Sequence, residues 1–526
     1  MLKYPKIKNF FSKLINGMPV AYFAALMSVI NLLFFYFPFF NFVLNNVNLS
    51  SLNGIVIFIS LIVVVLVANF FAFYLICFLL RFVGKMIIAL SFIISSLAIY
   101  FIVTYNVILD GSMIGNVFNT DYDEAMSFFS FKMVLYVVLF GLLPCFYIFR
   151  AKLNYGTWKR FVTTASLTVG LILVVVFANA GNWLWIDKYA KELGGLVMPW
   201  SYTVNTVRYQ MQKHQKNKVE ILLPDAIIGN DEKDVVVLVI GESARRHNFS
   251  LYGYEKPTNP LLEGDSVYVF DATSCTTYTT GSLKCILEHE DTGELYEILP
   301  NYLYRNGIEV IWRTTNWGEP PLHIKHYQVR QDLMQICQGD DCEYDEVLLT
   351  DLEKQITANG NNKVLVVLHT STSHGPQYSK KYPPRFEVFT PVCNSVELAN
   401  CTRDELMNAY DNTIVYTDYI LHQIIDILKQ MNDYNSMLLF VSDHGESLGE
   451  KNLYMHGRPI SIAPKEQYEI PFIVWLSDNS RRLKPNKELT QHHVFHSVLD
   501  FLGVQSPVYN SNLSIFEPNS DMQDKP

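Results

Sequence analysis

Charge is scarce in this chain. Only 17% of its 526 residues are Asp, Glu, Lys or Arg, whereas an average soluble protein has about 25%. Cysteine is sparse too, since eight residues in 526 exclude a small scaffold built on disulfides. No internal repeat or low-complexity segment stands out, and half of the residues are hydrophobic, which excludes a disordered chain. This length predicts two or more folded domains.

The few charges are unevenly divided along the chain. Residues 1–202 contain 13 basic and 6 acidic residues, which leaves 28 and 44 for the remainder. The first part therefore has a net charge of +7 and the second part a net charge of −16. An acidic second part argues against nucleic acid as a partner. The division indicates a membrane anchor that carries a water-soluble domain.

Long apolar segments dominate the first 180 residues. A membrane-spanning helix needs about 20 mostly apolar residues. Five segments meet or approach that length, so we expect a five-helix transmembrane bundle over residues 1–180 rather than buried helices of a soluble protein. The segments are Met18–Phe39, Gly54–Leu80, Met86–Val103, Met133–Phe149 and Val162–Ala178.

Basic residues mark one side of the expected membrane. They precede the first segment and lie between the second and third and between the fourth and fifth, whereas the other two connections carry none before Lys132. The positive-inside rule then places the N-terminus in the cytoplasm, and five crossings place the soluble domain on the opposite side. The first segment is too long for a signal peptide and lacks a small-residue cleavage site, so we expect it to be retained.

Three tryptophans follow the last apolar segment. Trp183, Trp185 and Trp200 lie in a mixed stretch, and tryptophan is enriched at membrane surfaces. Residues 181–225 are therefore predicted to bridge the two domains along the membrane surface. The alternative is an ordinary linker whose aromatic side chains pack on the soluble domain.

Short β-branched runs alternate with helical patterns after residue 226. Continuous apolar runs bounded by polar turns are typical of central strands that are covered on both faces. Strands that alternate with helices predict a doubly wound α/β sheet over residues 226–526. The predicted strands are Val235–Ile240, Val310–Trp312, Lys363–Leu368, Met437–Val441 and Pro471–Leu476, and the best helix is Glu405–Met431.

Six cysteines of the soluble part form close pairs in the sequence. We expect three disulfides between sequence neighbours, because each would close a short loop, although six cysteines allow 15 pairings. Disulfides fit a domain outside the cytoplasm. A zinc site made only of cysteines is the alternative, but the CxxC…CxxC spacing is missing. The pairs are Cys275 with Cys285, Cys337 with Cys342, and Cys393 with Cys401.

Polar residues follow the predicted strands at the points where the strands end. Glu242 follows the first, and Asp443 and His444 follow another. Ligands of α/β sheets bind at the carboxyl ends of the strands, so these three side chains should meet at one edge. Carboxylates with an imidazole suit zinc or manganese better than calcium. Each residue alone would more often be a helix cap or a solvated side chain.

A hydroxyl-rich loop supplies candidates for a nucleophile. Residues 274–287 read SCTTYTTGSLKCIL, and the apolar residues after Gly281 predict a helix. A hydroxyl at a helix N-terminus beside a divalent cation is activated by both charges. A capping loop is the alternative, and the local sequence does not choose among its four threonines.

Several motifs, taken together, indicate which enzyme family the chain resembles. VIGESARRHNFSLYGY (239–254), HGP (374–376), SDHGESLGE (442–450) followed by His456, and a cysteine-flanked threonine resemble the lipid phosphoethanolamine transferases. These are bacterial envelope enzymes of the alkaline phosphatase superfamily, and they include transferable polymyxin-resistance enzymes. The resemblance covers nearly the whole chain. It departs from the family pattern at Thr276, at Lys284, and after Asn316, where a family lysine has no counterpart.

The resemblance implies specific roles. Thr279 matches the family nucleophile. Thr277 and Thr280 lie so close to it in the sequence that they remain alternatives for this role. Glu242, Asp443 and His444, together with Thr279, match the ligands of one tightly bound zinc. His374 and His456 match residues that bind phosphate or a second zinc, and Asn316 matches a substrate contact. His369 is a less certain member of the set.

The resemblance also implies a reaction and a location. Phosphoethanolamine would move from phosphatidylethanolamine to lipid A, a core sugar or a surface protein through a covalent threonine intermediate. The protein would be a monomer in the bacterial inner membrane, surrounded by membrane lipids, with a periplasmic catalytic domain of the alkaline phosphatase type. The alternatives are a glycerophosphate transferase of the lipoteichoic-acid-synthase type and a non-catalytic membrane protein. A sulfatase is disfavoured because TTYT follows Cys275, so the C-x-P-x-R motif needed to make formylglycine is missing there.

Overall fold

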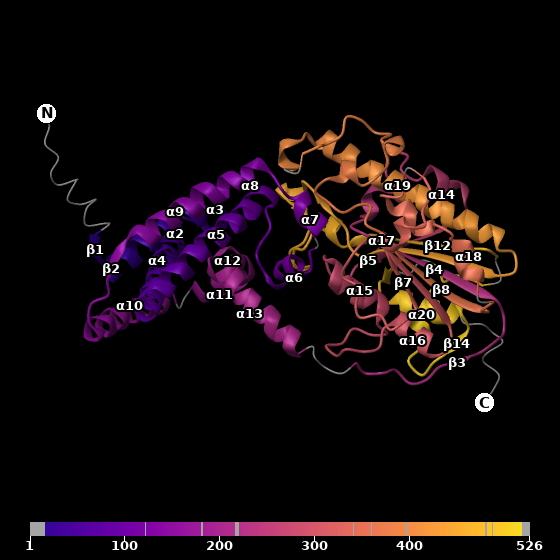
Figure 1. Cartoon of the computed structure of the whole chain (residues 1–526), viewed down its shortest axis with the longest axis horizontal. Coiled ribbons are helices and arrows are strands. Elements are labelled where there is room, and N and C mark those ends of the chain that lie inside the picture. Colours follow the sequence, from indigo (N-terminus) through magenta and orange to yellow (C-terminus); the bar gives the residue numbers. More distant parts are fainter. Residues whose placement is uncertain are drawn as a thin grey trace. The chain divides into compact units, whose positions relative to one another are not determined.

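Two units make up the chain (Figure 1). The membrane unit extends to Ile114 and resumes from Phe129 to Met211, and the catalytic unit contains Gly115–Phe128 and everything from Gln212. The structure is a computed structural model. It describes residues 16–517 except 121, 180–181, 216–219, 340, 359, 396–397, 479–480 and 486–487.

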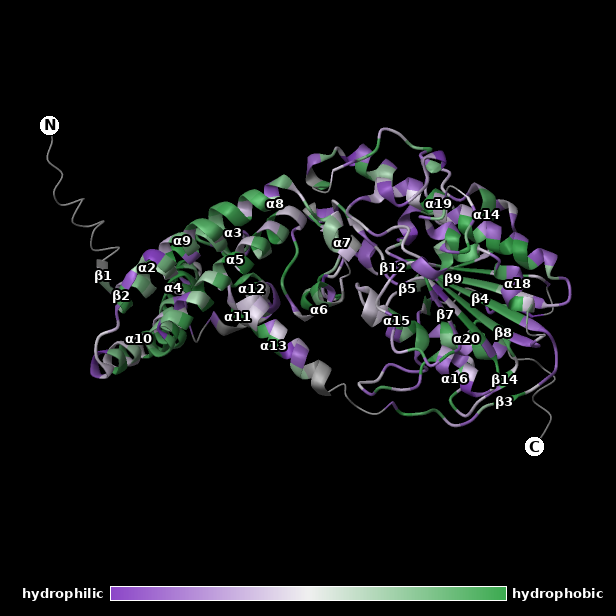
Figure 2. Cartoon of the chain, in the orientation of Figure 1, coloured by the Kyte–Doolittle hydropathy of each residue, from purple (hydrophilic) through white to green (hydrophobic). Residues whose placement is uncertain are grey.

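Apolar helices form the membrane unit, and Figure 2 shows them as almost continuously hydrophobic. Within the described residues, four helices are long and apolar enough to cross a membrane, and a fifth span is counted if one bent pair is taken together. The five predicted spans are thus present when the bent pair counts as one span. The helices are α4 (Leu52–Leu80), α5 (Phe82–Tyr105), the continuous stretch Phe131–Arg150 formed by α8 (Phe131–Tyr136), a π-helical turn (Val137–Leu142) and α9 (Leu143–Arg150), and α10 (Trp158–Ala178).

The first span is broken, contrary to the single helix expected over Met18–Phe39. Helices α2 (Val20–Phe35) and α3 (Phe37–Asn46) meet at Tyr36 with a bend of 65°. Pro38 explains the break, because proline lacks an N–H and its ring clashes with the carbonyl four residues earlier. The Tyr36 hydroxyl fills the bend by donating to Met198 O at 2.6 Å and accepting from Asn69 Nδ2 at 3.0 Å.

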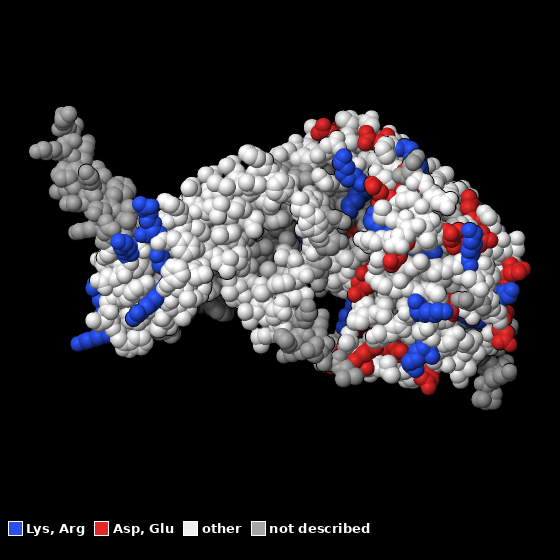
Figure 3. All heavy atoms as spheres, in the orientation of Figure 1, with Lys and Arg blue, Asp and Glu red and all other residues white. Residues whose placement is uncertain are grey.

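Basic residues gather at one end of the spanning helices on the face that Figure 3 shows. Figure 3 shows the surface of the membrane unit almost free of charge along its length, with Lys and Arg gathered at the end that carries β1 (Asn16–Pro19) and β2 (Lys152–Asn154). Lys85 is buried there and donates to Phe149 O at 3.2 Å and Ala151 O at 2.9 Å. This uneven distribution of Lys and Arg is the feature from which the cytoplasmic position of the N-terminus was predicted.

Two short helices and a longer one follow the last span: α11 (Trp183–Lys188), α12 (Ala190–Leu196) and α13 (Trp200–Gln215). Trp185 Nε1 donates to Asn46 O and Trp200 Nε1 donates to Asn69 Oδ1, both at 3.0 Å. These two tryptophans therefore pack within the membrane unit rather than on the soluble domain. The side chain of Trp183 lies outside the described part of the chain.

An eight-stranded mixed sheet forms the centre of the catalytic unit, in the order β13-β5-β12-β9-β4-β8-β6-β7. The four central strands β9, β4, β8 and β6 are parallel, and β12 is antiparallel to both of its neighbours. All five predicted strands are present. The bounds are β4 (Asp234–Gly241), β5 (Tyr268–Thr273), β6 (Glu309–Thr314), β7 (His326–Val329), β8 (Lys363–His369), β9 (Asn435–Ser442), β12 (Glu469–Leu476) and β13 (Leu489–Thr490).

Helices cover both faces of this sheet (Figure 1). On one face, α15, α16 and α20 bury apolar side chains against β4, β6, β8 and β9, and α19 covers the other face. The doubly wound architecture is confirmed, although the sheet is mixed rather than wholly parallel. The helices are α14 (Pro260–Gly264), α15 (Thr279–Leu287), α16 (Leu299–Arg305), α17 (Arg330–Met334), α18 (Leu352–Thr357), α19 (Arg403–Gln430) and α20 (His493–Phe501).

A buried ion pair joins the amino ends of β4 and β8. Lys363 Nζ contacts Asp234 Oδ2, and the two side chains are 3% and 0% exposed. Asn435 Nδ2 adds a hydrogen bond to Asp234 Oδ1 at 3.0 Å. The pair is thus fully satisfied, and removal of one partner would leave an uncompensated charge in the core.

We expect Asp234→Asn to lower the free energy of unfolding of the catalytic unit by about 3 kcal/mol, because Lys363 loses its counter-charge. Guanidinium-induced unfolding of the full chain in detergent measures this. The matched control is Asp351→Asn, which breaks the exposed pair with Lys354 and should shift the midpoint far less. Equal shifts for the two variants would contradict the prediction.

Candidate active site

Two adjacent parallel strands deliver the predicted metal ligands. Strands β4 and β9 pair in register up to Gly241 and Ser442, so Glu242 and the Asp443–His444 pair leave the same edge of the sheet. All three side chains are fully buried. His444 Nε2 lies 3.6 Å from Glu242 Oε1 and 3.3 Å from Asp443 Oδ2. Ligands at about 2.1 Å from a tetrahedral zinc lie about 3.4 Å apart, so this spacing fits one ion.

One oxygen of Asp443 points into this space without a partner among the described residues. Oδ1 accepts from Ser243 N at 2.9 Å and from His444 N at 2.6 Å, whereas buried Oδ2 accepts from none. Burial and the neighbouring Glu242 carboxylate raise the pKa of Asp443 well above its usual range. A buried polar atom of this kind requires a partner, and a divalent cation would provide it.

The protonation states of His444 and Glu242 also favour the binding of a cation. Burial and the nearby His456 lower the pKa of His444 to about 4, so its imidazole is neutral at physiological pH. Its Nδ1 lies 2.9 Å from Gly445 O, which leaves Nε2 free to bind a metal. Burial opposes ionisation of Glu242, but His374, His444, His456 and the Ser243 hydroxyl outweigh it and lower its pKa. The donor set therefore fits zinc or a similar ion.

Thr279 is the threonine that faces this cradle. It opens α15, is 4% exposed, and its Oγ1 lies 3.3 Å from Glu242 Oε2 and 3.4 Å from His444 Nε2. The hydroxyl of Thr277 instead donates to Arg458 O at 2.5 Å. The structure thus brings Thr279 to the site, as the resemblance implied.

Asn316 reaches the site from the end of β6. Its Nδ2 donates to Glu242 Oε2 at 2.8 Å and to Thr370 O at 2.9 Å, and it lies 3.1 Å from His369 Nε2. On the far side of the ring, His369 Nδ1 lies 2.8 Å from Glu319 Oε1. Glu319 is a contact that sequence reasoning missed, because it occupies the stretch where the family pattern is broken.

His374 and His456 lie beside the cradle, and their ring centroids are 5.6 Å apart. The His456 ring lies 4.2 Å from that of His444, and His456 Nδ1 is 2.9 Å from Glu446 Oε2. Burial raises the pKa of Glu446 to about 8. Ligand atoms of Glu242, His444 and His456 all lie within 4.8 Å of one another.

Two further residues of the quoted motifs hold the ligands in place and were not predicted. Ser243 donates from Oγ to Glu242 Oε1 at 2.6 Å and adopts a left-handed backbone conformation, with φ of 52°. Such strain concentrates at functional sites. Glu446 is fully buried against His456. Both residues lie within GES and SDHGES, where the motif was the only available signal.

The segment Gly115–Phe128 of the catalytic unit also reaches this region. Asn116 Nδ2 lies 3.5 Å from the position that a Cβ on Gly457 would occupy, and Gly457 follows His456 directly. Short helices α6 (Gly111–Asn119) and α7 (Tyr122–Ser127) carry the segment. Sequence reasoning took this stretch only as a connection between two membrane spans.

The expected disulfides are present in part. Cys337–Cys342 and Cys393–Cys401 are bonded, with S–S distances of 2.10 and 2.06 Å. Cys275 and Cys285 are free thiols, which corrects the third pairing. Their thiols hydrogen-bond to each other and to His492 instead, with Cys275 Sγ 3.4 Å from His492 Nε2.

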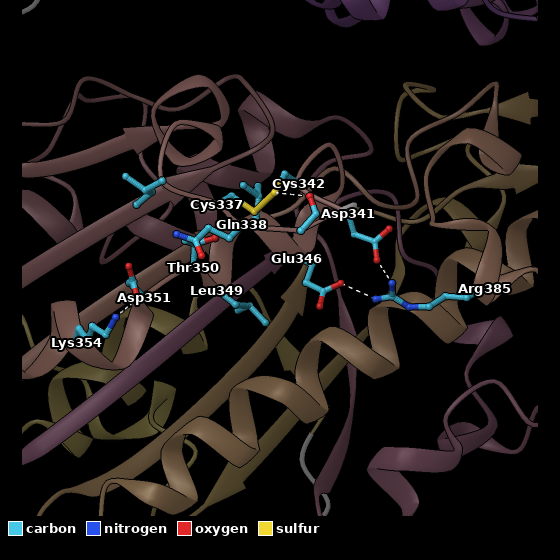
Figure 4. Close-up of a pocket in the computed structure, with 13 residues that line it drawn as sticks. Cys337, Gln338, Asp341, Cys342, Glu346, Leu349, Thr350, Asp351, Lys354 and Arg385 are labelled. Atoms are coloured by element: carbon cyan, nitrogen blue, oxygen red, sulfur yellow. Dashed lines mark hydrogen bonds and ion pairs between the residues drawn. A yellow bond between two sulfur atoms is a disulfide. The ribbon is translucent and has the colours of Figure 1, made fainter.

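A cavity of about 480 Å³ adjoins the Cys337–Cys342 disulfide, and none of the candidate metal ligands lines it (Figure 4). Its charges pair with one another: Arg385 with Asp341 and Glu346, and Lys354 with Asp351. Because its cations are already neutralised, this cavity offers no evident site for a charged ligand.

Two family models match the chain. Residues 234–504 match the sulfatase model, and residues 64–214 match the model of phosphoethanolamine transferase EptA/EptB. The sulfatase match covers more than half of the chain and agrees with the observed sheet. The transferase match covers most of the membrane unit.

Individual proteins agree with these models. Phosphoethanolamine transferase EptA of Helicobacter pylori is 42% identical over 81% of this chain and 84% of its own length. Phosphatidylethanolamine transferase Mcr-1 of Escherichia coli is 32% identical over 75% of this chain and 79% of its own. The integral membrane lipooligosaccharide phosphoethanolamine transferase A of Neisseria meningitidis superposes with a TM-score of 0.87, at 28% identity, over 95% of this chain and 99% of that one. The chain belongs to the phosphoethanolamine transferases of the alkaline phosphatase superfamily.

Proposed function

We propose that this enzyme transfers phosphoethanolamine from phosphatidylethanolamine to lipid A or to another acceptor of the bacterial envelope. The observation that carries the proposal is the Thr279 hydroxyl, which faces the Glu242–Asp443–His444 cradle at 3.3 and 3.4 Å. The relatives favour phosphatidylethanolamine over the phosphatidylglycerol of the alternative reaction, because their names specify ethanolamine. The catalytic unit would act in the periplasm.

The proposed ion is one zinc, held by Glu242, Asp443, His444 and Thr279. When bound there, zinc would lower the pKa of the threonine hydroxyl and neutralise charge on the phosphate. His374 and His456 are the residues that would hold a second ion or the phosphate oxygens.

The reaction has two steps with Thr279 as the covalent carrier. In the first, Thr279 Oγ1 bonds to phosphorus, diacylglycerol departs with a proton, and Glu242 Oε2 is the acceptor nearest to the hydroxyl proton. In the second, the acceptor oxygen bonds to phosphorus and Thr279 recovers its proton. The imidazoles of His374 and His456 face the charge that develops on the non-bridging oxygens.

We expect a mass increase of one phosphoethanolamine in the wild-type chain incubated with phosphatidylethanolamine, and none in Thr279→Ala. Intact mass spectrometry of the full chain in detergent measures this increase. Thr280→Ala is the matched control, because it removes the neighbouring hydroxyl and should retain the increase. An increase that survives in Thr279→Ala would move the nucleophile, and a glycerol phosphate increment from phosphatidylglycerol would support the alternative donor.

We expect the purified chain to contain one zinc, and Asp443→Asn to lower zinc affinity at least about 100-fold, because a charged ligand is lost from a four-ligand site. Metal analysis and competition with a chelator measure the content and the affinity, independently of activity. His374→Ala should retain the first ion. A content of two ions in the wild type that falls to one in His374→Ala would establish the second site, and zinc retained in Asp443→Asn would contradict the ligand set.

A further inference from the structure

A second, smaller pocket lies at the tip of the hairpin that leads to His456. Strands β10 (Ser447–Leu448) and β11 (Tyr454–Met455) pair antiparallel, and their connecting loop forms one wall of a cavity of about 270 Å³. The start of α19 forms the other wall. We call this cavity the hairpin pocket; it is lined by Cys401, Arg403, Leu406 and residues of the hairpin from Leu448 to Tyr454.

Two cations in the hairpin pocket have no partner of their own. Arg403 and Lys451 line it, both are exposed, and neither makes an ion pair or hydrogen bond among the described residues. By contrast, the Arg385 and Lys354 of the larger cavity are paired with carboxylates. Unpaired cations stand out in a catalytic part that carries 44 acidic and 28 basic residues.

Glu450, a carboxylate that lines this pocket, is paired with an arginine that does not line it. Glu450 Oε1 accepts from buried Arg245 at 2.8 Å, and Arg245 is only 4% exposed. This bond also lowers the pKa of Glu450, although burial opposes it. Because Glu450 is balanced by Arg245, the charge that faces the cavity is that of Arg403 and Lys451. The pocket is therefore an anion site by charge.

Both walls of the pocket are held rigidly. The Cys393–Cys401 disulfide ends two residues before Arg403, and a capping box of Thr402 and Glu405 fixes the start of α19. On the other wall, Leu448 N donates to Glu450 Oε2 at 2.6 Å, and Lys451 adopts a left-handed backbone conformation with φ of 52°. Rigid walls lower the entropy cost of binding a ligand.

The hairpin connects this pocket with the catalytic residues. Glu446 and His456, which contact each other at 2.9 Å, stand at its base, and Leu448 and Tyr454 stand two residues away from them. Two strand residues span about 7 Å, so the near edge of the pocket, at Leu448 and Tyr454, lies about that far along the hairpin from Glu446 and His456, and Lys451 lies further along the loop. Leu406 and Leu448 add apolar surface for the body of the same ligand.

We propose that the hairpin pocket binds a phosphate monoester of the acceptor, a phosphorylated glycolipid, and so holds the acceptor while another of its groups attacks phosphoethanolamine–Thr279. The proposal rests on the transfer reaction proposed above and adds the residues that hold a non-reacting phosphate of the acceptor. An acceptor with two phosphates would offer one to the pocket and one to the reaction. Guanidinium and ammonium groups are the side chains that recognise phosphate.

The test compares bisphosphorylated lipid A with its monophosphorylated form as acceptors for the full chain in detergent. We expect the wild type to have about a tenfold lower KM for the bisphosphorylated form, since a charged hydrogen bond contributes about that factor. The double variant Arg403→Gln/Lys451→Gln should lose this preference. Lys354→Gln removes one charge at the other cavity and is the matched control, which should retain the preference.

Soluble probes separate phosphate from sugar. Glucosamine 1-phosphate should inhibit transfer by the wild type, glucosamine should not, and the double variant should be insensitive to both. A preference that persists in the double variant, or an equal rise of KM for both acceptors, would overturn the proposal. The covalent step can be measured alone, as formation of phosphoethanolamine–Thr279 in the absence of acceptor. If the double variant loses this step to the same extent as it loses transfer, the pocket serves the donor, and the proposal is overturned. Failure of the wild type to load would count instead against the transfer reaction itself.

Discussion

The burial of two carboxylates side by side is the constraint on which this site depends. Glu242 and Asp443 are fully buried and flank one imidazole nitrogen of His444. Two like charges in a medium of low dielectric repel each other strongly, and their desolvation is costly as well. The arrangement is stable only with a cation between them or a proton on one of them. The raised pKa of Asp443, caused by burial and by the neighbouring Glu242 carboxylate, expresses this conflict.

The rest of the site is arranged around this constraint. Parallel pairing of β4 and β9 places both carboxylates at one edge, and the strained Ser243 donates to both of them, from its backbone to Asp443 and from its hydroxyl to Glu242. Thr279 enters from the first turn of α15. Gly318, at φ of 92°, lets a loop pass so close that a Cβ there would lie 3.1 Å from Thr280 Cγ2. The first turn of α15 is thus held by packing on one side and, through Thr279, by the Glu242–His444 cradle on the other.

The apolar strands and the strand-end residues could be predicted from the sequence, because buried strands read as continuous apolar runs. Their directions could not, since an apolar run has no polarity, and so the antiparallel β12 was not foreseen. Strand β5 was missed because its side chains are largely exposed.

Individual residues show the same limit. The bend at Tyr36 depends on Pro38 within an otherwise uniform apolar run. Glu446 resembles any acidic residue of its motif until packing places it against His456. Thr279 was identified by resemblance, because four threonines share its loop and only the structure shows which one faces the ligands.

The order of segments along the chain bears on why the catalytic unit is attached to membrane helices. Gly115–Phe128 leaves the membrane unit after α5, belongs to the catalytic unit, and returns to the membrane unit before α8. Its Asn116 lies next to Gly457, the residue that follows His456. The segment that carries Asn116 therefore continues at both ends into membrane helices, whereas a simple anchor would need one connection. Because both ends of the segment are fixed in this way, the chain constrains the segment beside Gly457 from two directions rather than one.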